Sequence, residues 1–169
     1  MPGFNSYIGK NVKLGRDVKI WHLTYIGDNT SIGDGTSIGS LTHIDYNVKI
    51  GRNVKIEGMV YIPPLTEIGD GVFIGPGVVF TNDPYPTSKR LVGVKVEDEA
   101  VIGAGAVIKA GVRIGRRSVV AMGALVTKDV PDGAVVMGFP ARPVYSREEY
   151  ERKKGEWEAK GGGGGPRTL

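Results

Sequence analysis

The chain carries a large apolar residue at every sixth position over most of its first half. The series begins at Ile8, continues mainly as isoleucine and ends at Phe80. The position four residues further on, from Val12 to Val78, is valine or threonine throughout. Short turns rich in Gly, Asp and Asn stand between these positions, as in IGDNTS and IGDGTS. A period of six fits neither an amphipathic helix nor an alternating strand.

Short strands separated by tight corners explain this period. β-Branched residues favour strands, and Gly or Asn accepts the positive φ that a tight corner needs. Stacking such segments buries one apolar residue per hexad in a continuous column, which is a β-solenoid. The alternative is a meander of short antiparallel strands, which the long in-phase series disfavours. The pattern therefore predicts an all-β chain built of stacked coils.

The rhythm breaks once, at VVFTNDPYPTSKR, residues 78–90. The apolar series then resumes as Val96, Ile102, Ile108, Ile114, Val120 and Val126. The step from Phe80 to Val96 is sixteen residues, four more than two hexads, so about four residues at least leave the wall. Two prolines prevent regular ladder hydrogen bonds there. We predict a protruding loop at about residues 82–94, and a long loop in a minimal solenoid is more often functional than decorative.

Over about residues 8–144 the hexads resemble those of the hexapeptide-repeat acyltransferases. The resemblance implies a left-handed parallel β-helix in which three hexads form one triangular coil. Handedness rests on the resemblance alone, because parallel crossovers are otherwise right-handed in about 98% of cases. We expect residues 1–144 to form this acetyltransferase domain.

The C-terminal part of the chain changes character. Residues 145–160 are expected to form a short charged helix, with Ser146 and Glu149 as a capping box. The glycine-rich residues 161–169 are expected to be a disordered tail.

Charge and composition exclude several classes of partner. The net charge of +4 is too small for a nucleic-acid-binding surface but suits a ligand that carries phosphate. Cysteine is absent, so no disulfide framework is possible. No signal core and no apolar run of membrane-spanning length are present. We therefore expect a cytoplasmic protein that binds neither nucleic acid nor membrane.

The loop contains an asparagine where a base would be expected. In the family this loop reaches a neighbouring subunit of a homotrimer, and acetyl-CoA meets the acceptor in the cleft between them. Many members that acetylate sugar hydroxyls or antibiotics carry a loop histidine as general base. Here Asn82 stands at that place, and asparagine is no base at neutral pH. A hydroxyl must lose its proton during attack whereas a neutral amine offers a lone pair, so the departure favours an amine acceptor.

The stretches IWH (20–22), FTND (80–83) and GFPAR (138–142) resemble one subgroup, the nucleotide-sugar N-acetyltransferases. Those enzymes acetylate the 3-amino group of a UDP- or dTDP-linked amino sugar for surface polysaccharide. Asn82 is expected to orient the sugar or its amine, and the alternative is an asparagine that only forms a turn before Asp-Pro. Asp83 is expected to accept a proton, to bind a sugar hydroxyl or to cap the loop. His22 is expected in the cleft or at a surface or trimer interface.

The loop also contains two basic residues near the position of an arginine in the subgroup. The subgroup usually has a Pro-Arg pair in the loop, but this chain reads PTSKR. Lys89 or Arg90 therefore takes the place of that arginine in substrate binding. His43 is expected to be structural.

The late hexads match the side of the family's fold that binds acetyl-CoA. Small residues there let the pantetheine arm lie against the backbone, although small residues also simply fit tight corners. Lys128, Arg113, Arg116 and Arg117 are candidates for the CoA phosphates, and one or two of them are expected to serve. The predicted cofactor-binding residues are Gly103, Ala104, Ala121, Ala124, Lys128 and Arg142.

Three other functions fit parts of the sequence. An O-acetyltransferase of the same fold remains the nearest alternative. A purely structural β-helix has no need of a proline-rich loop or of the GFPAR closure. The γ-type carbonic anhydrases share the fold but bind zinc through three histidines, and a catalytic zinc normally takes three protein ligands. With two histidines and no cysteine, no metal site is expected.

Overall fold

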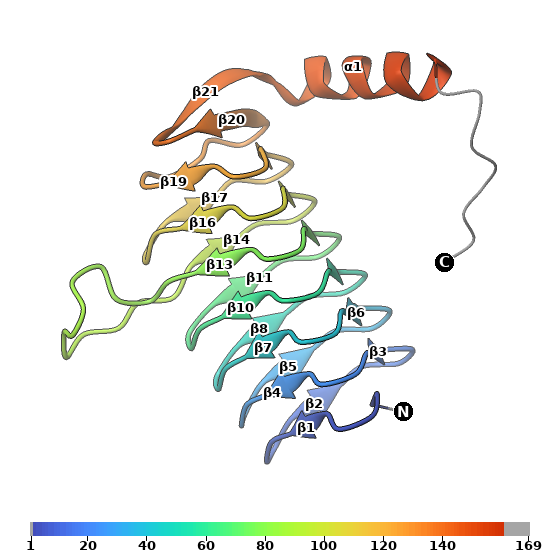
Figure 1. Cartoon of the computed structure of the whole chain (residues 1–169), viewed down its shortest axis with the longest axis vertical. Coiled ribbons are helices and arrows are strands. Elements are labelled where there is room, and N and C mark those ends of the chain that lie inside the picture. Colours follow the sequence, from blue (N-terminus) through green and yellow to red (C-terminus); the bar gives the residue numbers. More distant parts are fainter. Residues whose placement is uncertain (1, 161–169) are drawn as a thin grey trace.

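The computed structural model describes residues 2–160, so the predicted tail at 161–169 lies outside the described residues. The chain forms a left-handed β-helix with a triangular cross-section and three sheets, whose strands are parallel except at the C-terminal end of the third (Figure 1). The first sheet contains β1 (Tyr7–Ile8), β4 (Tyr25–Ile26), β7 (His43–Ile44), β10 (Tyr61–Ile62), β13 (Val79–Phe80), β16 (Val107–Ile108) and β19 (Leu125–Val126). The second contains β2 (Lys13–Leu14), β5 (Ser31–Ile32), β8 (Lys49–Ile50), β11 (Glu67–Ile68), β14 (Lys95–Val96) and β17 (Arg113–Ile114). The third contains β3 (Lys19–Ile20), β6 (Ser37–Ile38), β9 (Lys55–Ile56), β12 (Phe73–Ile74), β15 (Val101–Ile102), β18 (Val119–Val120), β20 (Ala134–Gly138) and β21 (Ala141–Ser146).

Three consecutive strands make one coil, and we number the coils 1 to 7 from the N-terminus. Coil 1 is β1–β3, coil 5 is β13–β15, and coil 7 begins at β19. Each coil turns three corners. The loop corner joins the first sheet to the second, the charged corner joins the second to the third, and the apolar corner joins the third back to the first. Adjacent coils are about 4.8 Å apart, the usual spacing of hydrogen-bonded strands.

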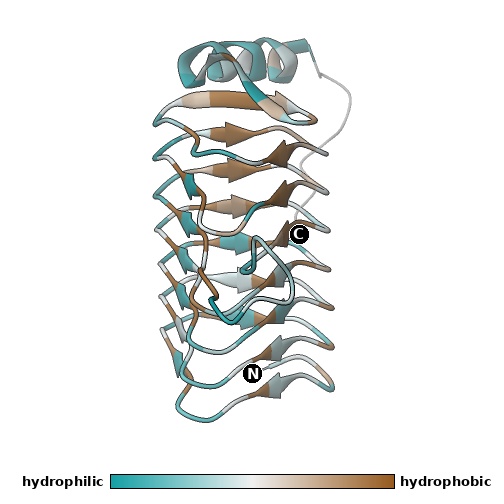
Figure 2. Ribbon diagram, turned by 90° about the vertical axis from the view of Figure 1, so that its left-hand side faces the viewer, coloured by the Kyte–Doolittle hydropathy of each residue, from teal (hydrophilic) through white to brown (hydrophobic). Residues whose placement is uncertain are grey.

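The predicted apolar columns form the core. The second residue of nearly every short strand points inward and is buried, as for Ile26, Phe80 and Ile114. Figure 2 shows hydrophobic residues recurring on the strands of every coil. Coil 1 is the exception, because no coil lies below it: Ile8 is half-buried and Leu14 is exposed. The six-residue period is therefore confirmed as one side of the triangle.

A ladder of threonine hydroxyls links neighbouring coils inside the corners. Thr30 Oγ1 donates to the carbonyl of Asp45 at 3.0 Å, and Thr36 Oγ1 donates to that of Gly51 at 2.9 Å. Thr66 occupies the equivalent position below the long loop. It is fully buried, and among residues 2–160 its Oγ1 has no hydrogen-bond partner. The chain leaves the wall directly above it, so the loop costs the fold one hydrogen bond.

Thr66→Val is expected to stabilise the protein, because valine fills the same space without an unsatisfied hydroxyl. The expected gain is about 1 kcal/mol in the free energy of unfolding. Thr36→Val is the matched control, since its hydroxyl also accepts from Val54 N at 3.1 Å. That change should destabilise by about 1–3 kcal/mol. Equal losses in both variants, measured by denaturant unfolding, would contradict the role assigned to Thr66.

The C-terminal end differs from expectation in one element. The predicted helix at 145–160 is α1 (Arg147–Lys160), and Glu149 N donates to Ser146 Oγ at 3.4 Å as the capping box requires. Before it, β20 and β21 pair antiparallel and close the top of the β-helix (Figure 1). Repeat counting did not predict this hairpin, because it abandons the hexad period. Within residues 2–160 no helix is both long and apolar enough to cross a membrane.

Candidate functional site

The long loop leaves the wall between β13 and β14, at the loop corner of coil 5. Sixteen positions separate Phe80 from Val96, where six separate equivalent residues elsewhere. These two strands are consecutive sides of one coil, so the loop adds ten residues, more than the minimum of four that the repeat count suggested. Figure 1 shows it projecting sideways from the β-helix.

The base of the loop is tied to the wall on both sides. Thr81 Oγ1 donates to the carbonyl of Ile108 at 3.1 Å and accepts from Ala110 N at 2.8 Å, which fixes the departing chain on coil 6. Val92 N donates to the carbonyl of Asn82 at 2.8 Å, which closes the loop where it returns. Asn82 is therefore held by backbone contacts at the junction of wall and loop.

The side chain of Asn82 lies at the junction of wall and loop. The residue is half-buried, and within the described part of the chain no hydrogen bond engages its side-chain amide. An amide offers both donors and an acceptor, so a sugar substituent of either kind can pair with it. The backbone anchoring of this residue means that the amide is presented from a rigid element.

Both carboxylate oxygens of Asp83 accept hydrogen bonds from the loop itself. Oδ1 accepts from Tyr85 N at 2.9 Å and Oδ2 accepts from Ser88 N at 2.7 Å. Desolvation favours the neutral acid, but the hydrogen bonds from Ser88 and Tyr85 outweigh it and hold the pKa of Asp83 below its ordinary value. A carboxylate with a lowered pKa is a weaker base. Of the roles considered for Asp83, capping the loop is the one that this geometry supports.

The apolar corner carries a track without side chains in coils 4 to 6. Gly77, Gly105 and Gly123 stack there with φ near +67°, at 68°, 66° and 67°. A Cβ at any of the three would meet nothing within 4 Å. The backbone conformation alone does not demand glycine, because Leu41 takes the same corner position in coil 2 with φ 62°. The glycines therefore leave an open path over the corner.

The small residues predicted to bind the cofactor flank this track. Gly103 and Ala104 precede Gly105, and Ala121 lies one coil above. A Cβ at Gly103 would lie 2.5 Å from Met122 N, so this glycine is needed for stacking of the coils. The side chain of Ala124 is 1% exposed and faces the core, so only its backbone can reach a ligand. Repeat counting overlooked Gly77, Gly105 and Gly123, whose signal is glycine at a position that elsewhere carries leucine or methionine.

Lys128 and Arg142 lie together although they are distant in sequence. Both line a hollow of about 220 Å³ between the end of β19 and the start of β21, with Asp129 and Pro143. Lys128 stands at the loop corner of coil 7, two coils above Asn82. Two exposed cations beside an open hollow suit phosphate oxygens.

The three other candidate arginines are engaged elsewhere. Arg113 pairs with Glu97 at 2.9 Å and with Asp132 at 2.7 Å, Arg116 pairs with Asp98 at 3.0 Å, and Arg117 approaches Glu99 at 3.8 Å. Arg113 lies on β17 of the second sheet, and Arg116 and Arg117 lie at the charged corner. None of the three lines the hollow beside Lys128.

Neither histidine lies beside Asn82 within one chain. His22 stands at the apolar corner of coil 1, four coils below the loop, or about 19 Å along the axis. Its Nδ1 accepts from Phe4 N at 2.7 Å, which ties down the N-terminal segment. His43 projects from β7 in coil 3, and its ring stacks on that of Tyr25 at 4.5 Å.

Arg90 and Lys89 are both exposed on the loop. Arg90 N donates to Ser88 Oγ at 3.3 Å, so its backbone position is set by the loop while its guanidinium is solvent-facing.

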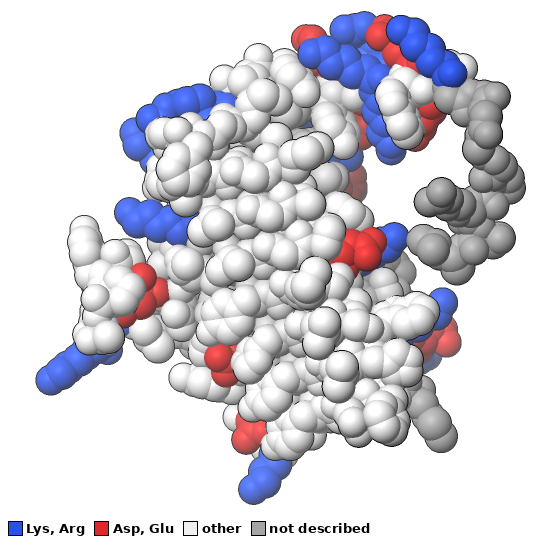
Figure 3. Space-filling model, viewed as in Figure 1, with Lys and Arg blue, Asp and Glu red and all other residues white. Residues whose placement is uncertain are grey.

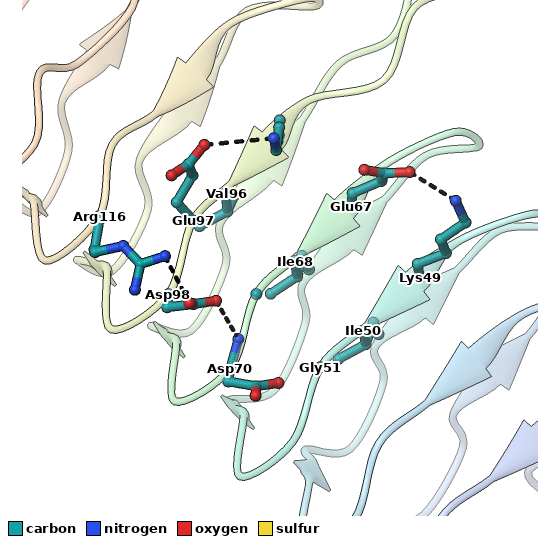
Figure 4. Close-up of a pocket in the computed structure, with 12 residues that line it drawn as sticks. Lys49, Ile50, Gly51, Glu67, Ile68, Asp70, Val96, Glu97, Asp98 and Arg116 are labelled. Carbon is teal, nitrogen blue, oxygen red and sulfur yellow. Dashed lines mark hydrogen bonds and ion pairs between the residues drawn. The ribbon is translucent and has the colours of Figure 1, made fainter.

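A larger hollow of about 400 Å³ lies over the second sheet and the charged corner (Figure 4). Its charged side chains largely neutralise one another: Lys49 Nζ lies 2.8 Å from Glu67 Oε1, and Lys95 Nζ lies 3.4 Å from Glu97 Oε1. Asp98 accepts from Asp70 N at 2.9 Å and so joins two coils. We interpret this surface as a structural ladder of ion pairs, because its cations are paired with neighbouring carboxylates, as is Arg116 with Asp98.

The glycine track and the loop lie on opposite edges of the first sheet. One side of the coil separates them, a distance of about 15–20 Å for six residues with corners. A single chain therefore cannot bring Asn82 to a ligand that lies on its own track. Two copies placed side by side, with the apolar corner of one beside the loop corner of the next, would bring the two together.

Sequence profiles of known families match most of the β-helix. Three overlapping matches to the family described as bacterial transferase hexapeptide (six repeats) cover residues 11–45, 29–64 and 47–82. A match to the hexapeptide repeat of succinyl-transferase covers residues 92–128. The loop lies between the two matched regions.

Individual proteins give shorter or weaker matches. A 2,3,4,5-tetrahydropyridine-2,6-dicarboxylate N-acetyltransferase of Staphylococcus aureus is 51% identical over 63 residues, which is 37% of this chain and 26% of that protein. The match thus spans about a quarter of the length of the curated relative.

Two solved structures have the same fold. WeeI from Acinetobacter baumannii is 31% identical with a TM-score of 0.51, covering 79% of this chain and 55% of that one. PerB from Caulobacter crescentus, solved with CoA and GDP-perosamine, is 23% identical with a TM-score of 0.53, covering 85% of this chain and 58% of that one.

Proposed function

The chain belongs to the hexapeptide-repeat transferases, and on that premise we propose that it moves an acetyl group from acetyl-CoA to the amine of a nucleotide-linked amino sugar. Residues 1–144 would form the catalytic domain. The proposal includes the cytoplasmic location and the role in surface polysaccharide synthesis that the family resemblance implies.

The observation that carries the proposal is the chemistry at the base of the loop. Among residues 2–160 the side-chain amide of Asn82 has no hydrogen-bond partner, whereas Asp83 is occupied by the loop and both histidines lie coils away. A site with an orienting amide and without a nearby base suits an acceptor that already has a lone pair. The Staphylococcus aureus relative, named as an N-acetyltransferase, supports an amine acceptor.

The reaction requires one bond to form and one to break. The amine nitrogen bonds to the acetyl carbon, the carbon–sulfur bond breaks, and the proton from nitrogen passes to the departing thiolate or to water. Asn82 would hold the amine in line with the acetyl carbon, and such positioning supplies much of the acceleration in reactions of this kind. Lys128 and Arg142 would bind phosphate groups, and the glycine track would hold the extended arm of the donor.

The site is proposed to form between copies in a cyclic trimer. In one chain the loop and the glycine track lie on opposite edges of the first sheet, so neither edge alone carries all the residues of the site. This separation supports the trimer. In a head-to-tail ring every loop meets the track of the next copy, so three equivalent sites result.

The substrate class is tested by release of free CoA thiol in the presence of acetyl-CoA and a panel of UDP- and dTDP-linked amino sugars. Each amino sugar is paired with the matching sugar that has a hydroxyl in place of the amine. We expect release with at least one amine and none with its hydroxyl partner. Equal rates with both members of a pair, with the acetyl group found on oxygen, would replace this proposal with an O-acetyltransferase.

Chelation is expected to leave activity unchanged. Within residues 2–160 no three His, Cys, Asp or Glu side chains gather in a way that could hold a metal ion. Amine acylation by positioning has no step that needs one. Activity should therefore persist after exhaustive dialysis against EDTA. Loss of acetyl transfer that zinc restores would overturn the account.

A further inference from the structure

Large apolar residues occupy an unusual backbone conformation in a row along the apolar corner. Leu23, Leu41 and Met59 stack in coils 1 to 3 with φ of 58°, 62° and 61° and exposed fractions of 51%, 55% and 61%. A left-handed backbone conformation is uncommon for large apolar residues, because it costs them more free energy than it costs Asn or Gly. We call these three residues the apolar row.

The other two corners show what this backbone position normally holds. The loop corner has Asn11, Asn29 and Asn47 in the same three coils, and the charged corner has Asp17, Gly35 and Asn53. Those residues suit both the positive φ and the solvent. Because the fold accepts polar residues at this position, the apolar row is not required by the isolated chain.

The sheet beside the apolar row is also uncharged on its outer surface. Figure 3 shows this face almost free of Lys, Arg, Asp and Glu, with charged side chains along its edges. The rings of Tyr7 and Tyr25 stack at 5.0 Å, and His43 continues the stack. The second sheet, in contrast, presents Lys49 and Glu67. The outward residues of the first sheet are Tyr7, Tyr25, His43, Tyr61, Val79, Val107 and Leu125.

We infer that the apolar row is the surface by which one copy of this chain holds the next, packing beside the loop corner of its neighbour. The residues of the apolar row repeat about every 4.8 Å along the axis, the distance between adjacent coils. A second copy of this chain has the same repeat, so each residue of the row can meet one coil of the neighbour. The loop corner offers exposed Tyr46 and Leu65 in coils 3 and 4 as apolar counterparts. An uncharged sheet facing its copies avoids the repulsion expected in a chain of net charge +4.

This inference rests on the proposed shared site and explains how that site stays open. The apolar row ends at Met59 in coil 3, and the column continues as Gly77, Gly105 and Gly123. Coils 1 to 3 would therefore close the contact between copies, while coils 4 to 6 leave a channel opposite the neighbour's loop. One corner thus serves both assembly and ligand access.

The double variant Leu41→Asn/Met59→Asn tests the apolar row. Asparagine suits the left-handed conformation, so the fold should be retained while the apolar surface is lost. Light scattering should give the wild type about three times the 18.0 kDa chain mass and the variant about the mass of one chain. The concentration at which the trimer dissociates should rise at least ~100-fold.

The matched control is Glu99→Asn/Arg117→Asn, which places asparagine at the same position of the charged corner, with φ of 58° and 53°. This control should remain trimeric. A second variant, Tyr46→Ser, changes the opposite edge and should dissociate as well, which keeps the test valid if the double variant does not fold.

A monomeric wild type, or a row variant that assembles as well as the control, would overturn the inference. These outcomes are independent of the proposed chemistry, which the substrate panel tests on the wild type alone.

Discussion

The double variant Gly105→Leu/Gly123→Leu is expected to bind acetyl-CoA at least ~100-fold more weakly than the wild type, a loss of about 2.7 kcal/mol. Leucine is tolerated at this corner position, as Leu41 shows with φ 62°, and a Cβ at either glycine meets no atom within 4 Å. The fold should therefore survive while two side chains fill the track. Calorimetric titration with acetyl-CoA measures the change.

The control for this variant is Gly133→Leu. Gly133 has a φ of 66° and equally open surroundings, but it stands at the charged corner. It should show the same modest loss of thermal stability per leucine and bind acetyl-CoA normally. Unchanged affinity in the double variant would mean that the donor does not lie on the glycine track.

Asn82→Ala is expected to lower kcat/KM for the amino sugar by one or two orders of magnitude, about 1.4–2.8 kcal/mol of transition-state stabilisation. The side chain makes no hydrogen bond within the described residues, so its removal should not loosen the loop, which the backbone bond from Val92 to Asn82 closes. Affinity for acetyl-CoA and trimer stability should change little.

Steady-state kinetics and thermal unfolding of the same preparation distinguish a role of Asn82 in orienting the substrate from a role in shaping the loop. Asp83→Asn is the useful comparison, because Asp83 holds Tyr85 N and Ser88 N and its loss should loosen the loop. Wild-type turnover in the Asn82 variant would show that this asparagine only makes a turn.

The β-helix itself could be predicted from the sequence because each hexad is one side of the triangle. Every inward position from Ile20 to Val126 is buried as the period requires. The size of the loop could not be predicted in the same way. Sixteen residues separate the two inward positions on either side of the loop. The chain returns to an inward position if ten residues leave the wall and equally if four do, so the period alone does not distinguish the two. The pairing of Glu67 with Lys95 shows that ten do.

That ambiguity also hid the geometry of the site. If one more hexad were assigned to the wall, every residue after the loop would be assigned to a different corner. Only the observed register puts Gly105 above Gly77 on the apolar corner and Lys128 above Asn82 on the loop corner. The inward orientation of Ala124 follows from the same register. Loop capping by Asp83 depends on the path of the loop, which no repeat encodes.

Each site is expected to take its loop from one copy and its track from the next, and subunit mixing tests this arrangement most directly. Chains with Asn82→Ala and chains with Gly105→Leu/Gly123→Leu are each nearly inactive alone. Differently tagged chains are co-expressed, and trimers containing both tags are purified and assayed for acetyl transfer.

Every trimer that contains both kinds of chain pairs an intact loop with an intact track at one of its three interfaces, so about a third of wild-type activity is expected in the purified mixed trimers. Both parent trimers, assayed alongside, should stay well below this level. Mixed trimers no more active than the better parent would show that loop and track act within one chain, which would contradict the account.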